Sequence, residues 1–203
     1  MPGFSLVREY ASLARFFEAA EVRLLLLRHA KSDWAGSDEM ADHERPLSAR
    51  GRSAAPKIAS YIRAKGYEPQ LVLCSTAKRT KETLKFMLPA FKHAPKVRYS
   101  RALYLAEWPA LLAAVHKAPV TSSPLLVIGH NPGLEQLAIA LSLQPKNAAE
   151  RVRAQRLAQK FPTGALAVLD FESADWRDVK PGHGRLTDYV RPKDIAHGGG
   201  AGE

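Results

Sequence analysis

Short, continuous apolar runs recur along the chain, and each is bounded by polar residues or turn formers. A run of this kind, without apolar–polar alternation, is typical of a strand that is buried on both faces of a sheet. Pro69 and Pro124 precede two of the runs, and a Pro-Thr-Gly turn precedes the last one. The predicted strands are residues 22–27, 71–74, 125–128 and 165–171, with a further extended segment at 97–105.

Helical segments are predicted between these runs. Ser48 is a suitable N-cap for a helix that ends near Gly66, and Pro56 inside it predicts a kink or a late start. Ser75 or Thr76 could cap the following helix. The predicted helices are residues 49–65, 77–87, 109–117, 134–143 and 146–160, whereas 31–47 is interpreted as a loop.

Strands that alternate with helices predict an α/β domain whose sheet carries helices on both faces. We place this domain at residues 22–195. Residues 1–21 are interpreted as an N-terminal extension with apolar residues on one helical face, and the glycine-rich residues 196–203 as a disordered tail.

The composition is that of a folded, water-soluble protein, with 46% apolar and 25% charged residues in a chain of 203. The apolar runs are too short to cross a bilayer, so we expect no membrane partner. The single cysteine, Cys74, ends a predicted strand and is interpreted as a core residue. Because no internal disulfide can form and no signal peptide is recognisable, we expect a cytoplasmic protein, and nothing in the sequence demands more than a monomer.

The positive charge is concentrated in one part of the chain. The net charge is +10, and residues 22–145 alone hold 18 basic and 9 acidic side chains. Such a field favours an anionic partner, which could be a phosphate ester, a phosphoprotein or a nucleic acid. The basic residues do not interleave with aromatic ones, and no helix-turn-helix or zinc pattern is present, so we expect no nucleic-acid partner. A non-catalytic anion-binding protein is kept as a distant alternative.

Polar side chains directly follow three of the predicted strands. Arg28 and His29 follow the first strand, residues 75–79 with Arg79 follow the second, and His130 follows the third. In open α/β sheets, ligands gather outside the carboxyl ends of the strands. We therefore expect two histidines and two arginines to meet at one edge of the sheet.

This set of side chains suits phosphoryl transfer. Guanidinium groups bind phosphate oxygens in forked pairs and neutralise the charge that develops during transfer. A neutral imidazole can attack phosphorus and form a phosphoenzyme, which water then cleaves. A second histidine, either charged or donating a hydrogen bond, can stabilise the transferring oxygens. The sequence offers no carboxylate cluster for a metal, and we expect neither metal nor cofactor.

Several motifs together carry a resemblance to a known family. The segment Leu-Leu-Leu-Arg28-His29 resembles the Arg-His-Gly signature of the histidine phosphatase (phosphoglycerate mutase-like) superfamily, with Ala30 in place of the glycine. The residues from Ala30 to Trp34 are similar to the SixA-type phosphohistidine phosphatases within it. Further matches, in the order of the family, are Arg45-Pro46-Leu47-Ser48, Ser75 to Thr80, Leu103-Tyr104, Gly129-His130-Asn131-Pro132, Phe161-Pro162-Thr163-Gly164 and Arg191-Pro192-Lys193-Asp194.

The resemblance implies a three-layer phosphoglycerate mutase-like fold around a central, mostly parallel sheet. It also implies that His29 accepts the phosphoryl group, that Arg28 and Arg79 bind the phosphate, and that His130 completes the pocket. Asn131 would present a donor beside His130.

Three further assignments are less closely defined by the resemblance. Arg45 is a candidate for the rim of the pocket, with a surface salt bridge as the alternative. Glu107 lies in the stretch where many members carry the glutamate that protonates the leaving oxygen, with Asp33 as the other candidate. The alternative interpretation of Glu107 is a carboxylate that stabilises the start of a helix.

The function implied is a metal-independent phosphatase that forms a phosphohistidine intermediate and acts on a phosphorylated protein, as a SixA-type phosphohistidine phosphatase does. A departing imidazole has an unperturbed pKa of about 6.5 and needs less help from a general acid than an alkoxide. The main alternative is a small-molecule phosphomonoesterase or mutase of the same superfamily, whose substrate is a small phosphate ester.

Overall fold

The computed structural model describes residues 21–34 and 40–197. The predicted helical extension before residue 21 and the part of the predicted tail after residue 197 lie outside the described residues. Within the described part, the last helix, α7 (Pro192–His197), extends two residues into the segment that the sequence assigns to the tail.

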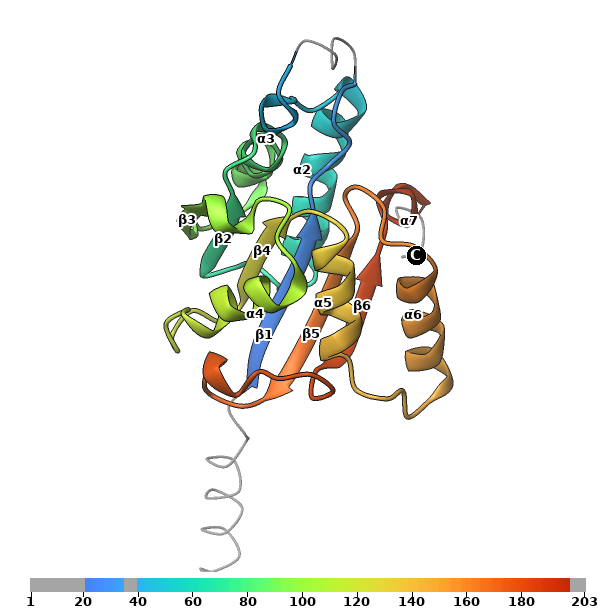
Figure 1. Cartoon of the computed structure of the whole chain (residues 1–203). Coiled ribbons are helices and arrows are strands. Elements are labelled where there is room, and N and C mark those ends of the chain that lie inside the picture. Colours follow the sequence, from blue (N-terminus) through green and yellow to red (C-terminus); the bar gives the residue numbers. More distant parts are fainter. Residues whose placement is uncertain (1–20, 35–39, 198–203) are drawn as a thin grey trace, which may run out of the picture.

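A six-stranded mixed sheet forms the centre of the domain (Figure 1), in the order β3-β2-β4-β1-β5-β6. The four strands β3, β2, β4 and β1 are parallel, and β5 and β6 are each antiparallel to the preceding neighbour. The predicted α/β class with a mostly parallel sheet is confirmed. The strands are β1 (Glu21–Arg28), β2 (Leu71–Ser75), β3 (Lys96–Ser100), β4 (Leu125–Gly129), β5 (Leu166–Glu172) and β6 (Arg185–Val190).

Helices cover both faces of this sheet, which explains why the central strands are continuously apolar. Leucines that alternate along β1 point to opposite faces: Leu24 and Leu26 belong to one core cluster, Leu25 and Leu27 to the other. One face is covered by α4 (Trp108–His116), α5 (Gly133–Leu141) and α6 (Ala148–Gln159), and the other by α2 (Ala49–Ala64), α3 (Lys78–Met87) and α7. Cys74 is fully buried in the second cluster, as predicted for a core residue.

Most boundaries agree with the pattern, and the differences have local causes. Ser48 caps α2 by accepting a hydrogen bond from the Gly51 amide at 3.2 Å. The helix begins at Ala49 and runs through Pro56, so the late start is wrong. The extended segment predicted at 97–105 ends at Ser100, where a 3-10 turn begins.

The sequence pattern missed β6 altogether. This strand is half polar, with Arg185, Thr187 and Asp188 among its six residues, so it presents no continuous apolar run. It lies at the edge of the sheet, where only one side of the strand is paired, and an edge strand tolerates such polar positions.

Candidate active site

The register of two parallel strands brings the two predicted histidines together. Arg28, the last residue of β1, pairs with Gly129, the last residue of β4. The His29 amide then donates to the Gly129 carbonyl oxygen at 3.1 Å. The imidazole rings of His29 and His130 consequently lie with their centroids 5.2 Å apart.

The His29 ring is held in one tautomer. Its Nδ1 lies 2.7 Å from the Ala30 carbonyl oxygen, which can only accept a hydrogen bond, so Nδ1 carries the proton and Nε2 keeps its lone pair. Only 6% of the residue is exposed. Burial lowers its pKa to about 3, and the positive charges of Arg79 and Arg28 act in the same direction. His29 is therefore neutral at pH 7, with a free lone pair on Nε2.

His130 is also buried and neutral. Its Nε2 lies 2.9 Å from the Ser75 hydroxyl oxygen, which in turn accepts from the Ala77 amide at 3.4 Å. In the tautomer that carries the ring's proton on Nδ1, this hydroxyl donates to Nε2. The Nδ1 atom is buried without a hydrogen-bond partner among the described residues. Burial first, and then the neighbouring His29, lower the His130 pKa to about 3, so His130 can act as a neutral donor.

Ser75 and Thr76 do not cap α3 as predicted. The N-cap of α3 is Ala77, and no side chain caps this end. The Ser75 hydroxyl is engaged with His130, and the Thr76 hydroxyl lies 3.0 Å from Nε2 of His43. The hydroxyls of Ser75 and Thr76 therefore contact two histidine rings instead of capping the helix.

Asp42, which no sequence pattern singled out, connects two arginines of the site. Its carboxylate accepts hydrogen bonds from Arg79 at 2.9 Å, from Arg45 at 2.8 Å and from the Tyr104 hydroxyl at 2.6 Å. Partial burial acts to raise the pKa of Asp42, but these three donors together hold it well below its usual range. Asp42 therefore occupies guanidinium donors that a phosphate oxygen could use. Its three-residue spacing before Arg45 was the available sequence signal.

Arg28 approaches the same space from the end of β1. Its Nη1 donates to the Phe161 carbonyl oxygen at 2.9 Å, and the Asn131 side chain donates to the same oxygen at 3.1 Å. The Arg28 Nε and the Asn131 Oδ1 are buried without a partner in the described structure. Gly164, at φ +76°, donates its amide to the carbonyl oxygens of Arg28 and His29, which ties the start of β5 to the end of β1.

These side chains line a pocket of about 180 Å³ at the carboxyl ends of the parallel strands. Four of the lining residues are basic, and no carboxylate is among them. Arg45 is 6% exposed, and its guanidinium lies 3.4 Å from the centre of the Trp34 ring, so it lines the site. It also forms the predicted salt bridge, with the partly exposed Asp42. The lining residues are Arg28, His29, Lys31, Ser32, Trp34, Arg45, Arg79, Leu105, His130, Asn131 and Thr163.

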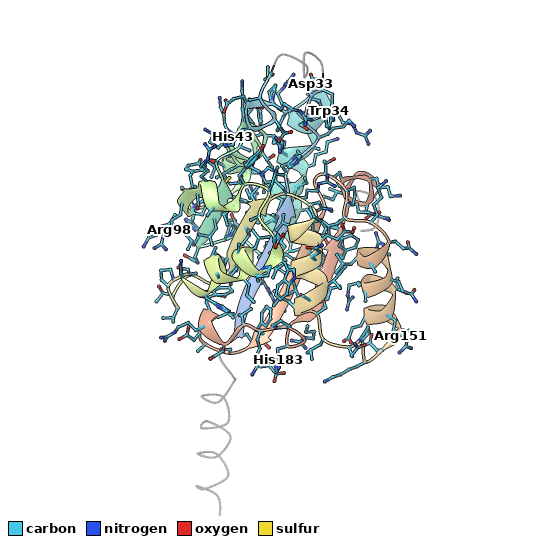
Figure 2. The ribbon with its side chains drawn as sticks, in the orientation of Figure 1. Asp33, Trp34, His43, Arg98, Arg151 and His183 are labelled. Carbon is cyan, nitrogen blue, oxygen red and sulfur yellow. The ribbon has the colours of Figure 1, made fainter. Side chains whose placement is uncertain are left out.

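Side chains project densely from the end of the sheet that carries this pocket (Figure 2), where Trp34, Asp33 and His43 are labelled. The structure thus brings together six of the seven predicted site residues. It adds Lys31, Ser32, Trp34, Leu105 and Thr163, which sequence reasoning did not select.

Neither predicted general acid lines the pocket. Glu107 is exposed at the N-cap position of α4 and makes no capping hydrogen bond. Asp33 contributes its backbone carbonyl oxygen, which accepts from Arg45 at 3.1 Å. The carboxylate that contacts the pocket's arginines is that of Asp42.

A larger hollow of about 900 Å³ lies at the opposite end of the sheet, near His183 (Figure 2). Its lining mixes carboxylates such as Glu172 and Asp178 with lysines and arginines, and Asp170 there is already paired with Arg23 at 2.6 Å. It lies away from the carboxyl ends of the parallel strands, so the smaller pocket is the better candidate for chemistry.

Comparison with known proteins gives consistent results. Residues 24–108 match the family model of the histidine phosphatase superfamily (branch 1). An uncharacterized protein of Mycobacterium tuberculosis (strain ATCC 25618 / H37Rv) is 38% identical over 168 residues, covering 82% of this chain and 100% of the relative.

Two solved structures are similar along almost their whole length. A protein assigned as the phosphohistidine phosphatase SixA from Agrobacterium tumefaciens is 30% identical, with a TM-score of 0.68 over 84% of this chain and 98% of its own. A protein from Nakamurella multipartita that is also assigned as SixA is 29% identical, with a TM-score of 0.72 over 86% of this chain and 98% of its own.

The described residues offer neither a metal-binding cluster nor a membrane-spanning helix. Residues 21–34 and 40–197 contain no cluster of three His, Cys, Asp or Glu side chains suited to a metal ion. No helix in this part of the chain is both long and apolar enough to span a membrane.

Proposed function

The chain belongs to the histidine phosphatase superfamily, and on that premise we propose that it is a phosphatase that forms a phosphohistidine intermediate at His29 without a metal ion. The observation that carries the proposal is the state of His29. Its Nδ1–H donates to the Ala30 carbonyl oxygen, so the neutral Nε2 offers a lone pair to a pocket whose described lining holds four cations and no carboxylate.

In the first step, the Nε2 lone pair of His29 attacks phosphorus, and the bond from phosphorus to the leaving nitrogen or oxygen breaks. Arg28 and Arg79 neutralise charge on the transferring oxygens. The Nδ1–H of His130, which lacks a partner in the described structure, can donate to one of these oxygens. Water then attacks phosphorus, the P–Nε2 bond breaks, and inorganic phosphate leaves as His29 regains its lone pair.

Substrate binding displaces Asp42 from its arginines in this scheme. A phosphate oxygen that takes the place of the Asp42 carboxylate receives hydrogen bonds from the same Arg79 and Arg45 donors. The exchange leaves the guanidinium groups paired throughout, so they remain positioned in the empty pocket as well as in the loaded one.

The finer assignment that we propose is a phosphohistidine phosphatase acting on a protein. Two lines support it. The first is the likeness to two proteins assigned as SixA. The second is that, among the described residues, no carboxylate lines the pocket, and the neighbouring Asp42 carboxylate is ionised by its bonds to Arg79 and Arg45, so neither supplies a proton to a leaving alkoxide. The ring of a phosphohistidine can carry a proton on its other nitrogen near neutral pH, since an imidazole has an unperturbed pKa of about 6.5, so the P–N bond breaks to release neutral imidazole without a general acid.

The test is phosphate release from para-nitrophenyl phosphate and from a histidine-phosphorylated protein, with EDTA present. We expect turnover that persists in EDTA, is lost in His29→Ala, and is retained in His93→Ala, a matched change at an exposed histidine. Turnover that persists in His29→Ala would overturn the proposal. Preference for a small ester over the phosphohistidine protein would favour the small-molecule alternative and reject the finer assignment.

A further inference from the structure

A second hollow adjoins the active-site pocket and is more strongly basic than the pocket itself. It has a volume of about 360 Å³ and shares Lys31 and Thr163 with the pocket. Five of its nine lining residues are lysine or arginine, and none is acidic. We call it the basic groove; its lining residues are Lys31, Arg50, Ala54, Lys160, Pro162, Thr163, Arg191, Pro192 and Lys193.

Four separate parts of the fold build the basic groove. The first turn of α2 supplies Arg50, the segment between α6 and β5 supplies Lys160, the start of α7 and the residue before it supply Lys193 and Arg191, and the segment after β1 supplies Lys31. Lys31, two residues after His29, stands where the groove meets the pocket. A ligand whose phosphoryl group lies at His29 can therefore continue directly into the groove.

Three of these cations have no counterion among the described residues. The side chains of Lys31, Arg50 and Lys160 are exposed and make no hydrogen bond or ion pair with any described residue. Arg191 is different, because it is paired with Asp194 at 3.1 Å. Like charges that converge without counterions repel one another, so an anionic ligand that binds among them relieves this repulsion.

The remaining lining indicates the size and type of ligand. Ala54, Pro162 and Pro192 give the groove apolar surface between its cations. A single phosphate would leave this apolar surface unused, whereas a polypeptide would bury it and place carboxylates against the lysines and arginines. The groove therefore fits the acidic surface of a protein better than a small anion.

We propose that the basic groove binds acidic residues that flank the phosphorylated side chain of a protein substrate. The proposal rests on the proposed phosphatase activity of the adjoining pocket and adds how that site selects its substrate. The groove raises the encounter rate and the affinity for acidic phosphoproteins and does not act on the phosphoryl group itself.

The test compares two synthetic peptides that each carry one phosphohistidine. One peptide has aspartate and glutamate on both sides of it, and the other has asparagine and glutamine at the same positions. Arg50→Glu/Lys160→Glu is the groove variant. The control, Arg98→Glu/Arg151→Glu, makes the same change in net charge at two exposed arginines of β3 and α6 (Figure 2) that line neither the groove nor the pocket.

We expect the groove variant to lose about tenfold in kcat/KM on the acidic peptide and to stay within about twofold of the parent on the neutral peptide and on para-nitrophenyl phosphate. The control should keep the parent's preference. The loss should shrink when the salt concentration is raised from about 0.02 M to about 0.5 M, because exposed charges are screened.

Three results would overturn the proposal. The groove variant could lose kcat/KM equally on both peptides, or the control variant could lose as much as the groove variant on the acidic peptide. The groove variant could also lose as much kcat/KM on fructose 1,6-bisphosphate as on the acidic peptide, which would assign the groove to a small second anion. If no substrate turns over, the proposed function fails, and the groove is still tested by fluorescence anisotropy of the two labelled peptides. In that case the groove variant should weaken binding of the acidic peptide alone, and unchanged binding would contradict the inference.

Discussion

Replacing His29 or His130 by asparagine is expected to reduce the loss of stability that the protein shows on mild acidification. Both rings are buried and neutral, and burial lowers the pKa of each to about 3. In the unfolded chain, a histidine titrates near pH 6.5. Between these two values the unfolded state binds protons that the folded state does not bind, so the free energy of unfolding falls as the pH is lowered.

The size of the effect follows from the two pKa values. Each pH unit below 6.5 costs about 1.4 kcal/mol for one such ring, so the change from about pH 7 to about pH 5 costs about 2 kcal/mol per histidine. The two rings together account for about 4 kcal/mol. Asp42 contributes with the same sign but at lower pH, because the stability from its depressed pKa is lost only as the pH falls through the ordinary carboxylate range, near pH 4, and below it. The window between pH 5 and 7 therefore isolates the histidines.

Urea unfolding at about pH 7, pH 6 and pH 5 measures this slope directly. His29→Asn and His130→Asn should each remove about 2 kcal/mol of the pH dependence, whatever each does to stability at pH 7. His93→Asn, at an exposed position, is the control and should keep the parent's slope. A parent whose stability does not change across the window, or an unchanged slope in both site variants, would refute the claim that these rings are held neutral by burial.

Three further changes test individual contacts. Ser75→Ala removes the hydroxyl beside Nε2 of His130. We expect urea unfolding to show a loss of about 1 kcal/mol in stability, and steady-state turnover to show a fall in kcat with little change in KM. An unchanged kcat would argue against a role of Ser75 in orienting the His130 ring. Asp42→Asn removes the internal counterion of Arg79, so inorganic phosphate should inhibit the variant several-fold more strongly than the parent in a competition assay. Weaker inhibition would contradict the proposal that phosphate displaces the Asp42 carboxylate. Glu107→Gln should stay within about twofold of the parent on para-nitrophenyl phosphate, since Glu107 does not line the pocket, whereas a large fall in kcat would identify it as the acid.

The part of the fold that the sequence predicts is the part set by local pattern. Continuous apolar runs mark β1, β2 and β4, and the rule that ligands gather at the carboxyl ends of parallel strands is enough to bring His29, Arg79 and His130 together. A local sequence pattern does not show which distant segments pair with each other. It therefore missed β6, which is held by its hydrogen bonds to β5 and has no continuous apolar run.

The same limit applies within the site. Asp42 lies in a stretch without periodicity, and only the folded chain shows that it reaches Arg79, 37 residues away. Ser75 shows the converse, because its position before α3 satisfies the rule for a helix cap while its hydroxyl is engaged with His130, 55 residues away. In both cases the deciding contact exists only after the strands have assembled.

The most direct measurement of the central claim is the identity of the phosphorylated residue during turnover. Protein mixed with para-nitrophenyl phosphate is quenched in alkali, which preserves phosphohistidine, and digested for peptide mapping by mass spectrometry. The account predicts one acid-labile phosphate, on the imidazole of His29, and no such label in His29→Ala. A phosphate found on any other residue, or turnover by His29→Ala, would contradict it.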